Sequence, residues 1–140
     1  MNHYTFQDLS IGHTESFSRT VTAEMMDRFL RISGDENPLH CSEEFAARRG
    51  YPGRVVYGML TASLYSTLAG VYLPGEYCLL YEVSSKFHQP VYIGDTLHVT
   101  GEVKEKNDVF QVVSIKATIT NENGEVVSTA KLKAGFTQQK

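Results

Sequence analysis

The stretch Gly58–Ala69 contains no charged residue, and it constrains the fold of this chain more than any other segment. Its length and composition predict a helix, and a helix without a charged face is usually buried on most sides. The small residues that would let strands approach this helix closely are Ala62, Ser63, Ser66 and Ala69. We therefore expect a central helix enclosed by the rest of the chain.

Four runs from Tyr77 onward show the alternation of apolar and polar residues that is typical of strands with one buried face. The short connections between these runs imply antiparallel neighbours, and Asn123-Gly124 is a two-residue hairpin motif. The alternating positions are Tyr77, Leu79, Tyr81, Val83 and Phe87; Leu97, Val99 and Val103; Val113, Ile115, Ala117 and Ile119; and Val126, Ala130, Leu132 and Phe136. The sequence therefore predicts an α+β domain in which an antiparallel sheet curls around one buried helix.

Helix and turn patterns dominate the chain before the central helix. Thr14–Thr20 alternates weakly and predicts a short first strand. The hydroxyl of Thr22 can cap a helix, which is expected to end at Gly34 because glycine readily takes positive φ. Ser42 is expected to cap a second short helix that runs through Phe45 to Arg49.

Length and composition favour a single domain that spans residues 1–140. A hydrophobic content of 41% and a charged content of 21% are typical of globular proteins, and a net charge of -3 argues against a nucleic-acid partner. The sequence shows neither a signal peptide nor a run of the ~20 apolar residues that cross a bilayer. We expect a cytosolic protein with Cys41 and Cys78 reduced.

Asp35 and His40 lie five residues apart, across the segment Asp35–Leu39, which is expected to be irregular because Pro38 lacks an amide hydrogen. A kinked segment can direct a carboxylate and an imidazole into one cavity, where they can hold a water molecule and move its protons. The same residue types are also ordinary in turns. On composition alone, the turn interpretation is favoured over the catalytic one.

Three separated segments of the chain resemble a known family. They are Ser33-Gly34-Asp35-Glu36-Asn37-Pro38-Leu39-His40, Tyr57-Gly58-Met59-Leu60-Thr61-Ala62-Ser63-Leu64 and Pro90-Val91-Tyr92-Ile93-Gly94-Asp95-Thr96-Leu97. Together, and in this order, they resemble the MaoC-like dehydratases and (R)-specific enoyl-CoA hydratases. The resemblance implies a hotdog fold, in which an antiparallel sheet wraps a central helix. It also implies reversible addition of water to a trans-2-enoyl thioester, giving an (R)-3-hydroxyacyl thioester.

The resemblance assigns roles to individual residues. Asp35 and His40 match the catalytic pair that would activate the water. Asn37 belongs to the same motif and would shape the loop or orient the water. Gly58 opens the central helix, where a free N–H group can stabilise the oxyanion of a thioester enolate. Ser66, two turns farther along, matches a polar position near the site.

Tyr57 is the main departure from the family pattern. The family usually has His-Gly-Met where this chain has Tyr57-Gly58-Met59. A phenol can replace the hydrogen bond of the imidazole or can reshape the substrate-binding pocket. The acyl preference is therefore left open.

No cofactor is expected beyond the coenzyme A or phosphopantetheine that forms part of the substrate. Arg48, Arg49 and Arg54 could meet its phosphates, although a solvated basic face explains them equally well. No metal site is expected, because the remaining histidines lack the spacing of zinc ligands. These histidines are His3, His13, His88 and His98.

Two alternatives and the oligomeric state remain open at this point. The alternatives are a hotdog thioesterase, which commonly carries an acidic residue on or near its central helix, and a non-catalytic acyl-binding module. An open sheet has unpaired edges, and hotdog domains typically pair into dimers. We therefore expect a homodimer or a dimer of dimers. Acyl chain length, carrier and pathway, fatty acid metabolism included, do not follow from the sequence.

Overall fold

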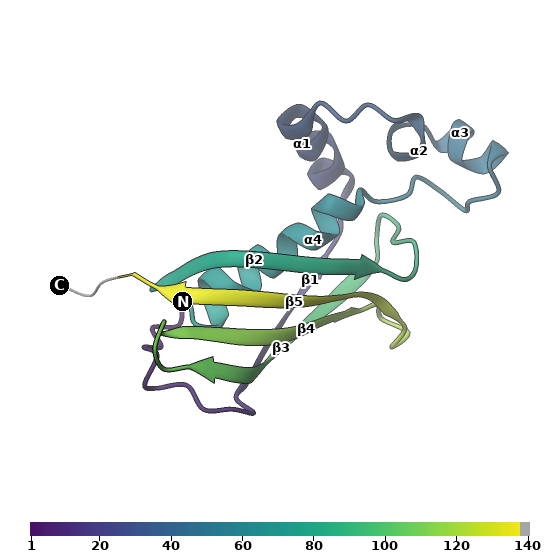
Figure 1. The fold of residues 1–140 in the computed structure, drawn as a ribbon. Coiled ribbons are helices and arrows are strands. Elements are labelled where there is room, and N and C mark those ends of the chain that lie inside the picture. The colour runs from purple at the N-terminus through teal and green to yellow at the C-terminus, as the bar shows by residue number, and fades with distance from the viewer. Residues whose placement is uncertain (138–140) are drawn as a thin grey trace.

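The computed structural model describes residues 1–137, and an antiparallel sheet that curves around one helix forms its centre (Figure 1). The strands are β1 (Thr14–Thr20), β2 (Cys78–Phe87), β3 (Thr96–Asn107), β4 (Val112–Thr120) and β5 (Val126–Phe136), in the order β1-β3-β4-β5-β2. The helices are α1 (Ala23–Ser33), α2 (Pro38–Cys41), α3 (Glu43–Arg48) and α4 (Gly58–Thr67), which continues into the π-helical turn η1 (Leu68–Tyr72). The predicted fold class is confirmed.

The core lies between α4 and the inner face of the sheet. The alternating residues of β3 and β4 are buried there as predicted, and so are Ala130 and Leu132 of β5. The other two predicted positions of β5 differ, because Val126 is 39% exposed and Phe136 is only partly buried. The buried hydroxyl of Tyr65 on α4 donates a 2.7 Å hydrogen bond to Ser128 Oγ on β5, and Ser128 donates in turn to the Lys86 carbonyl of β2. This chain of bonds satisfies the polar atoms within the core and fixes α4 against two strands.

The segment with α1, α2 and α3 projects beyond one end of the sheet and covers the N-terminal end of α4 (Figure 1). Thr22 caps α1 by accepting from the Met25 amide, and Gly34 ends it at φ 71°, as predicted. Ser42 caps α3 through the Phe45 amide, also as predicted. None of the helices in the described part of the chain is long and apolar enough to cross a membrane.

The prediction for Asp35–Leu39 is partly wrong, because Pro38 begins the short helix α2 rather than preventing one. Pro38 occupies the first helical position, where the missing amide hydrogen has no role. Asn123-Gly124 does not form a two-residue hairpin either. The connection between β4 and β5 runs over residues 121–125, and the Asn121 side chain accepts hydrogen bonds from the Asn123 and Glu125 amides.

Two features of β2 also differ from the sequence interpretation. Its register against β5 shifts between Leu80 and Glu82, so Val83 and Phe87 face the helix whereas Tyr81 lies over Gly135 on the outer face. Moreover, β2 does not pair with β3, the strand that follows it, but with β5. The short connection to β3 therefore crosses the end of the sheet, and β2 forms one of its edges.

The close approach of η1 to β3 depends on a glycine. A Cβ atom at Gly101 would lie 2.8 Å from Leu68 Cδ2 and 3.2 Å from Ile115 Cγ2, inside the packed core. We expect Gly101→Ala to lower the free energy of unfolding by about 1–3 kcal/mol, measured by urea denaturation. Gly70→Ala is the control, because a Cβ there meets nothing within 4 Å; equal stability of both variants would contradict this packing.

Candidate active site

The loop between α1 and α3 is held by local hydrogen bonds. The Asp35 carboxylate accepts from the Asn37 amide at 3.2 Å, and the side-chain oxygen of Asn37 accepts from the Leu39 amide at 3.0 Å, which caps α2. Asp35 and Asn37 are both exposed to solvent. The segment is therefore a structured turn that leaves the second carboxylate oxygen of Asp35 available to a water molecule.

The His40 imidazole has a defined orientation. Its Nδ1 atom lies 2.7 Å from the Val55 carbonyl oxygen, and the Val55 amide donates to the Leu39 carbonyl. Because a carbonyl can only accept, the proton of the neutral imidazole resides on Nδ1 and Nε2 is left as an acceptor. This tautomer presents Nε2 as the acceptor that a general base requires.

A cavity of about 300 Å³ brings His40 and Gly58 together; we call it the His40 cavity. Gly58 begins α4, where the first amide hydrogens have no partner within the helix and carry partial positive charge. Thr61 and Phe87 also line this cavity, and a Cβ at Gly58 would lie 3.5 Å from the Phe87 ring. A proton acceptor and an anion-stabilising helix terminus thus share one space.

Tyr57 lies directly behind this loop and is only 2% exposed. Its hydroxyl donates to the Asp35 carbonyl oxygen at 2.8 Å, and its ring centroid lies 4.3 Å from that of His40. The Tyr57 ring also contacts Phe29 of α1, with ring centroids 4.8 Å apart. Burial raises the pKa of the Tyr57 phenol, and the neighbouring Cys41 thiol adds to the rise, so the hydroxyl stays protonated.

Comparison with known proteins identifies the family. The family model described as "MaoC like domain" matches residues 9–124. The chain belongs to the MaoC-like family. The matched range includes the Asp35–His40 loop, α4 and the strands β1 to β4, and it ends before β5.

Relatives of this MaoC-like chain carry hydratase and dehydratase names. The 3-hydroxybutyryl-CoA dehydratase of Methylorubrum extorquens is 39% identical over 100 residues, which cover 71% of this chain and 64%, just under two thirds, of that protein. The (R)-specific enoyl-CoA hydratase of Rhodospirillum rubrum is 37% identical, with 76% of each chain covered. The solved structure of the (R)-hydratase from A. caviae involved in PHA biosynthesis superposes with a TM-score of 0.89 at 30% identity, covering 93% of this chain and 98% of that one. The hotdog fold is thereby confirmed.

The MaoC-like chain does not bring all the predicted site residues to the His40 cavity. Ser66 lies on an exposed part of α4, and Tyr57 is buried behind the loop; neither lines this cavity. Asp35 and Asn37 lie in the exposed loop before α2, and they do not line this cavity either. Among the described residues, no group of three or more His, Cys, Asp or Glu side chains is arranged to hold a metal ion.

The three arginines near the Gly50–Gly53 turn have separate surroundings. Arg54 Nε donates to the His40 carbonyl oxygen at 2.7 Å, and its side chain is 17% exposed, so it braces the loop. Arg48 pairs with Glu44 one turn earlier on α3, and Arg49 lies over the Phe45 ring. The roles of Arg54 and of the Val55 carbonyl in holding His40 could not be predicted from the sequence. Both depend on how the chain after α3 folds back against the loop that carries His40.

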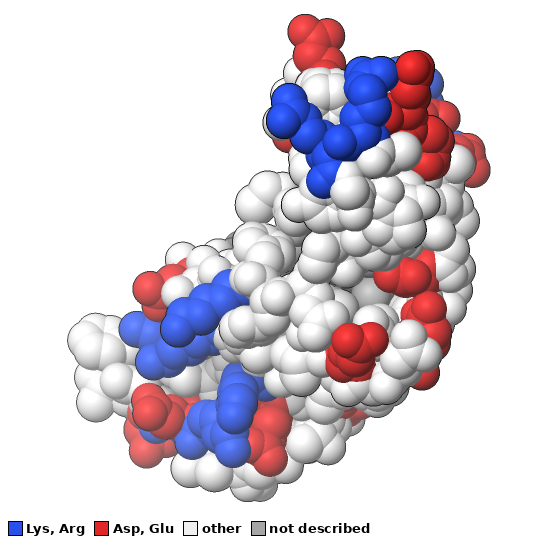
Figure 2. Space-filling view, turned by 90° about the vertical axis from the view of Figure 1, so that its right-hand side faces the viewer, with Lys and Arg blue, Asp and Glu red and all other residues white. Residues whose placement is uncertain are grey.

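Charged side chains of both signs share the face of the molecule drawn in Figure 2. Basic side chains gather there on the projecting helical segment at the top and again near the lower end, and each group lies beside acidic ones. Nucleic-acid binding normally requires a continuous basic surface. This face does not offer one, in agreement with the net charge of -3.

Proposed function

We propose that the chain catalyses the reversible hydration of trans-2-enoyl-CoA to (R)-3-hydroxyacyl-CoA, as a hydro-lyase. The observation that carries the proposal is the shared cavity of His40, with Nε2 left as an acceptor, and Gly58 at the start of α4. The names of the hydratase and dehydratase relatives support it. The test is the loss of enoyl thioester absorbance in the presence of the purified protein.

In the proposed mechanism, a water molecule is held between the carboxylate of Asp35 and Nε2 of His40. Nε2 takes one proton as the water oxygen bonds to C3 of the enoyl group. The π pair of the C2–C3 bond then forms the C1–C2 double bond, and the π pair of the carbonyl moves onto its oxygen. The Gly58 amide and the positive end of α4 stabilise this enolate oxygen. The enolate then collapses as C2 accepts a proton from the pair, which returns the site to its starting state.

The oxyanion role of Gly58 predicts a loss of activity without a loss of fold. Gly58→Ala places a Cβ atom in ordinary contact with the Phe87 ring, 3.5 Å away, but the added methyl occupies space needed by the thioester. We expect kcat/KM to fall by about tenfold to a hundredfold, as for other small displacements of reacting groups. Gly70→Ala, farther along the same helical segment, is the control; an unchanged kcat/KM in Gly58→Ala would argue against the assignment.

We also propose that the active unit is a homodimer formed along β2. This edge strand exposes large apolar side chains, and one of them, Phe87, lines the His40 cavity. The exposed residues are Leu79, Leu80, Tyr81, Val83 and Phe87. An unpaired apolar edge is a template for pairing with a second strand, and a second copy there would enclose the substrate.

A charge on this edge tests the homodimer. We expect Val83→Lys to shift the protein to monomer in light scattering and to reduce activity, because an inward-facing charge opposes strand pairing. Val109→Lys is the matched control, since Val109 is an exposed valine outside β2, in the connection between β3 and β4. A wild-type protein that is already monomeric and fully active would contradict the proposal.

The thioesterase alternative has less support, because no acidic residue lies on α4. Thiol release from an acyl-CoA, without change at the double bond, would favour it. The choice between coenzyme A and a carrier protein, the acyl length, the absence of a cofactor and the cytosolic location stay predictions. A panel of enoyl thioesters of increasing length, on both carriers, addresses the first two.

A further inference from the structure

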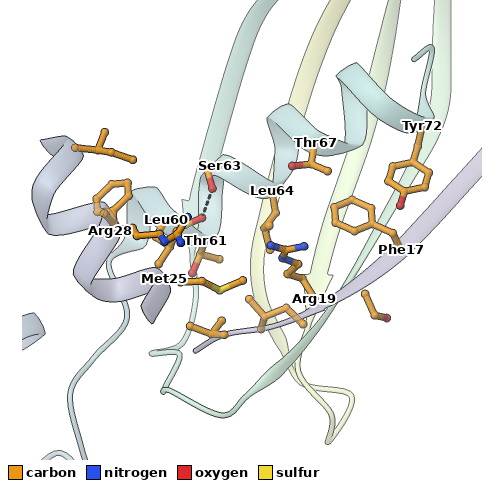
Figure 3. A pocket seen from close by; sticks show the side chains of 15 residues that line it. Phe17, Arg19, Met25, Arg28, Leu60, Thr61, Ser63, Leu64, Thr67 and Tyr72 are labelled. Atoms are coloured by element: carbon orange, nitrogen blue, oxygen red, sulfur yellow. Dashed lines mark hydrogen bonds between the residues drawn. The ribbon is translucent and has the colours of Figure 1, made fainter. Parts of the chain in front are cut away.

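A second cavity, of about 400 Å³, lies between α1, α4 and β1; we call it the α1–α4 cavity (Figure 3). Its wall is mostly apolar. Phe17 and Tyr72 stack at one end with ring centroids 4.8 Å apart, and Met25, Leu60 and Leu64 continue the surface. This volume falls in the range of about 300–1,000 Å³ that is usual for small-molecule sites.

The α1–α4 cavity is separate from the proposed reaction site. With 3.6 residues per turn, Leu60, Leu64 and Thr67 lie on a different face of α4 from Gly58 and Ser66. The first three residues line the α1–α4 cavity, and the last two do not. Of the residues that line the His40 cavity, Thr61 alone also lines this one. Occupation of one cavity therefore does not require occupation of the other.

Arg19 brings a positive charge to this apolar wall. It pairs with Leu97 across the β1–β3 ladder and shares the inner face of the sheet with Phe17. Figure 3 shows its side chain extending from β1 into the space below α4. No salt bridge of Arg19 is found among residues 1–137, whereas Arg28, the other arginine of the cavity, pairs with Glu24 at 2.8 Å.

The cavity opens beside Arg19 and Arg28 into a polar groove. Both arginines, Ser18 and Met25 line the apolar cavity as well as the groove. Glu24 lines the groove but not the apolar cavity. The two arginines and one glutamate give the boundary a net charge of +1 (two positive minus one negative). A ligand complementary to this arrangement has a flexible apolar chain and one anionic group at its end.

We propose that the α1–α4 cavity binds a medium-chain fatty acid, with the alkyl chain between α1 and α4 and the carboxylate against Arg19. Two competing roles for Arg19 and for this space lead to different expectations. An inward-facing charge can simply protect the edge strand β1 from pairing. A second copy of the chain can also cover the cavity. Neither role leads to saturable binding of a carboxylate.

Titration with dodecanoate below its critical micelle concentration, followed by methyl NMR of the full chain, tests the proposal. We expect saturable shifts of the Leu60 and Leu64 methyl groups and little change at Val55 and Val127, which line the His40 cavity. Shifts confined to the valines, or no saturable shift, would overturn the proposal. Because no turnover is measured, the result is independent of the proposed hydratase activity.

Variants then test the role of the charge. We expect Arg19→Gln to weaken dodecanoate binding by about tenfold or more, the usual effect of losing a hydrogen bond to a charged group. Arg31→Gln is the control, because Arg31 lies on α1 but lines neither this cavity nor the groove. Dodecanol should bind wild-type protein more weakly than dodecanoate. Equal affinities for the two ligands, or for Arg19→Gln and wild type, would overturn the carboxylate assignment.

Discussion

Asp35→Asn and His40→Ala should each lower kcat/KM for the hydration of a short trans-2-enoyl-CoA by about 10²–10⁴-fold, the usual contribution of general acid–base catalysis. The fold should persist, because Asp35 is exposed and the oxygen of an asparagine can still accept from the Asn37 amide. His40 is only partly buried, and its imidazole bonds to a single carbonyl. Initial rates from enoyl absorbance measure the loss, and circular dichroism checks the fold.

Glu36→Gln is the control for these two variants. Glu36 lies next to Asp35 in the same exposed loop, and its replacement removes the same negative charge from the chain. If hydration depended only on the charge of the loop, Glu36→Gln and Asp35→Asn would be equally impaired. Substantial activity in both Asp35→Asn and His40→Ala would show that this pair does not perform the chemistry.

Tyr57 gives the second large effect, because it contacts both ends of the Asp35–His40 segment. Tyr57→Ala should lower the free energy of unfolding by about 3–5 kcal/mol, since it leaves a cavity where a buried ring was packed. Tyr57→Phe keeps the ring against His40 but removes the 2.8 Å hydrogen bond to the Asp35 carbonyl. We expect its kcat to fall by about tenfold with KM little changed, because a displaced loop impairs the reaction more than binding.

A comparison with Tyr4→Phe separates positioning from general stability. Tyr4 also donates a hydrogen bond, at 2.7 Å to Glu15, but it lies in the N-terminal segment away from the His40 cavity. Its loss should affect unfolding in denaturant and leave kcat unchanged. Burial raises the pKa of Tyr57, so its hydroxyl does not lose its proton near neutral pH. Wild type and Tyr57→Phe should therefore show pH–rate profiles of the same shape near neutrality. A normal kcat in Tyr57→Phe would contradict the positioning role.

The sequence predicted the features of this fold that depend on local chemistry. Thr22 and Ser42 cap helices because a hydroxyl next to free amides has one favourable geometry, and Gly34 ends α1 because it can adopt φ 71°. The alternation in β4 survives because the extra residue at the register shift between β3 and β4, Lys104, lies on β3, so that no residue is inserted into β4 between Val113 and Ile119. The loop with Asp35 and His40 could be identified from its motif alone.

Features set by distant partners could not be predicted in this way. The Tyr81 ring next to the register shift lies over Gly135, a residue of a distant strand. The edge position of β2 depends on its pairing with β5 rather than with β3, the next strand along the chain. The Tyr57–Asp35 bond joins residues 22 positions apart through a buried ring. Likewise, the absence of charge on α4 predicted burial on most sides, yet Met59 is 66% exposed because no other part of the described chain covers that face.

Chiral analysis of the product formed from a short trans-2-enoyl-CoA tests the proposed function most directly. With Asp35→Asn as the blank, the wild-type protein should convert the substrate to (R)-3-hydroxyacyl-CoA, and the reverse reaction should regenerate the enoyl thioester. Formation of the (S) product, or release of free thiol without addition of water, would contradict the proposed function.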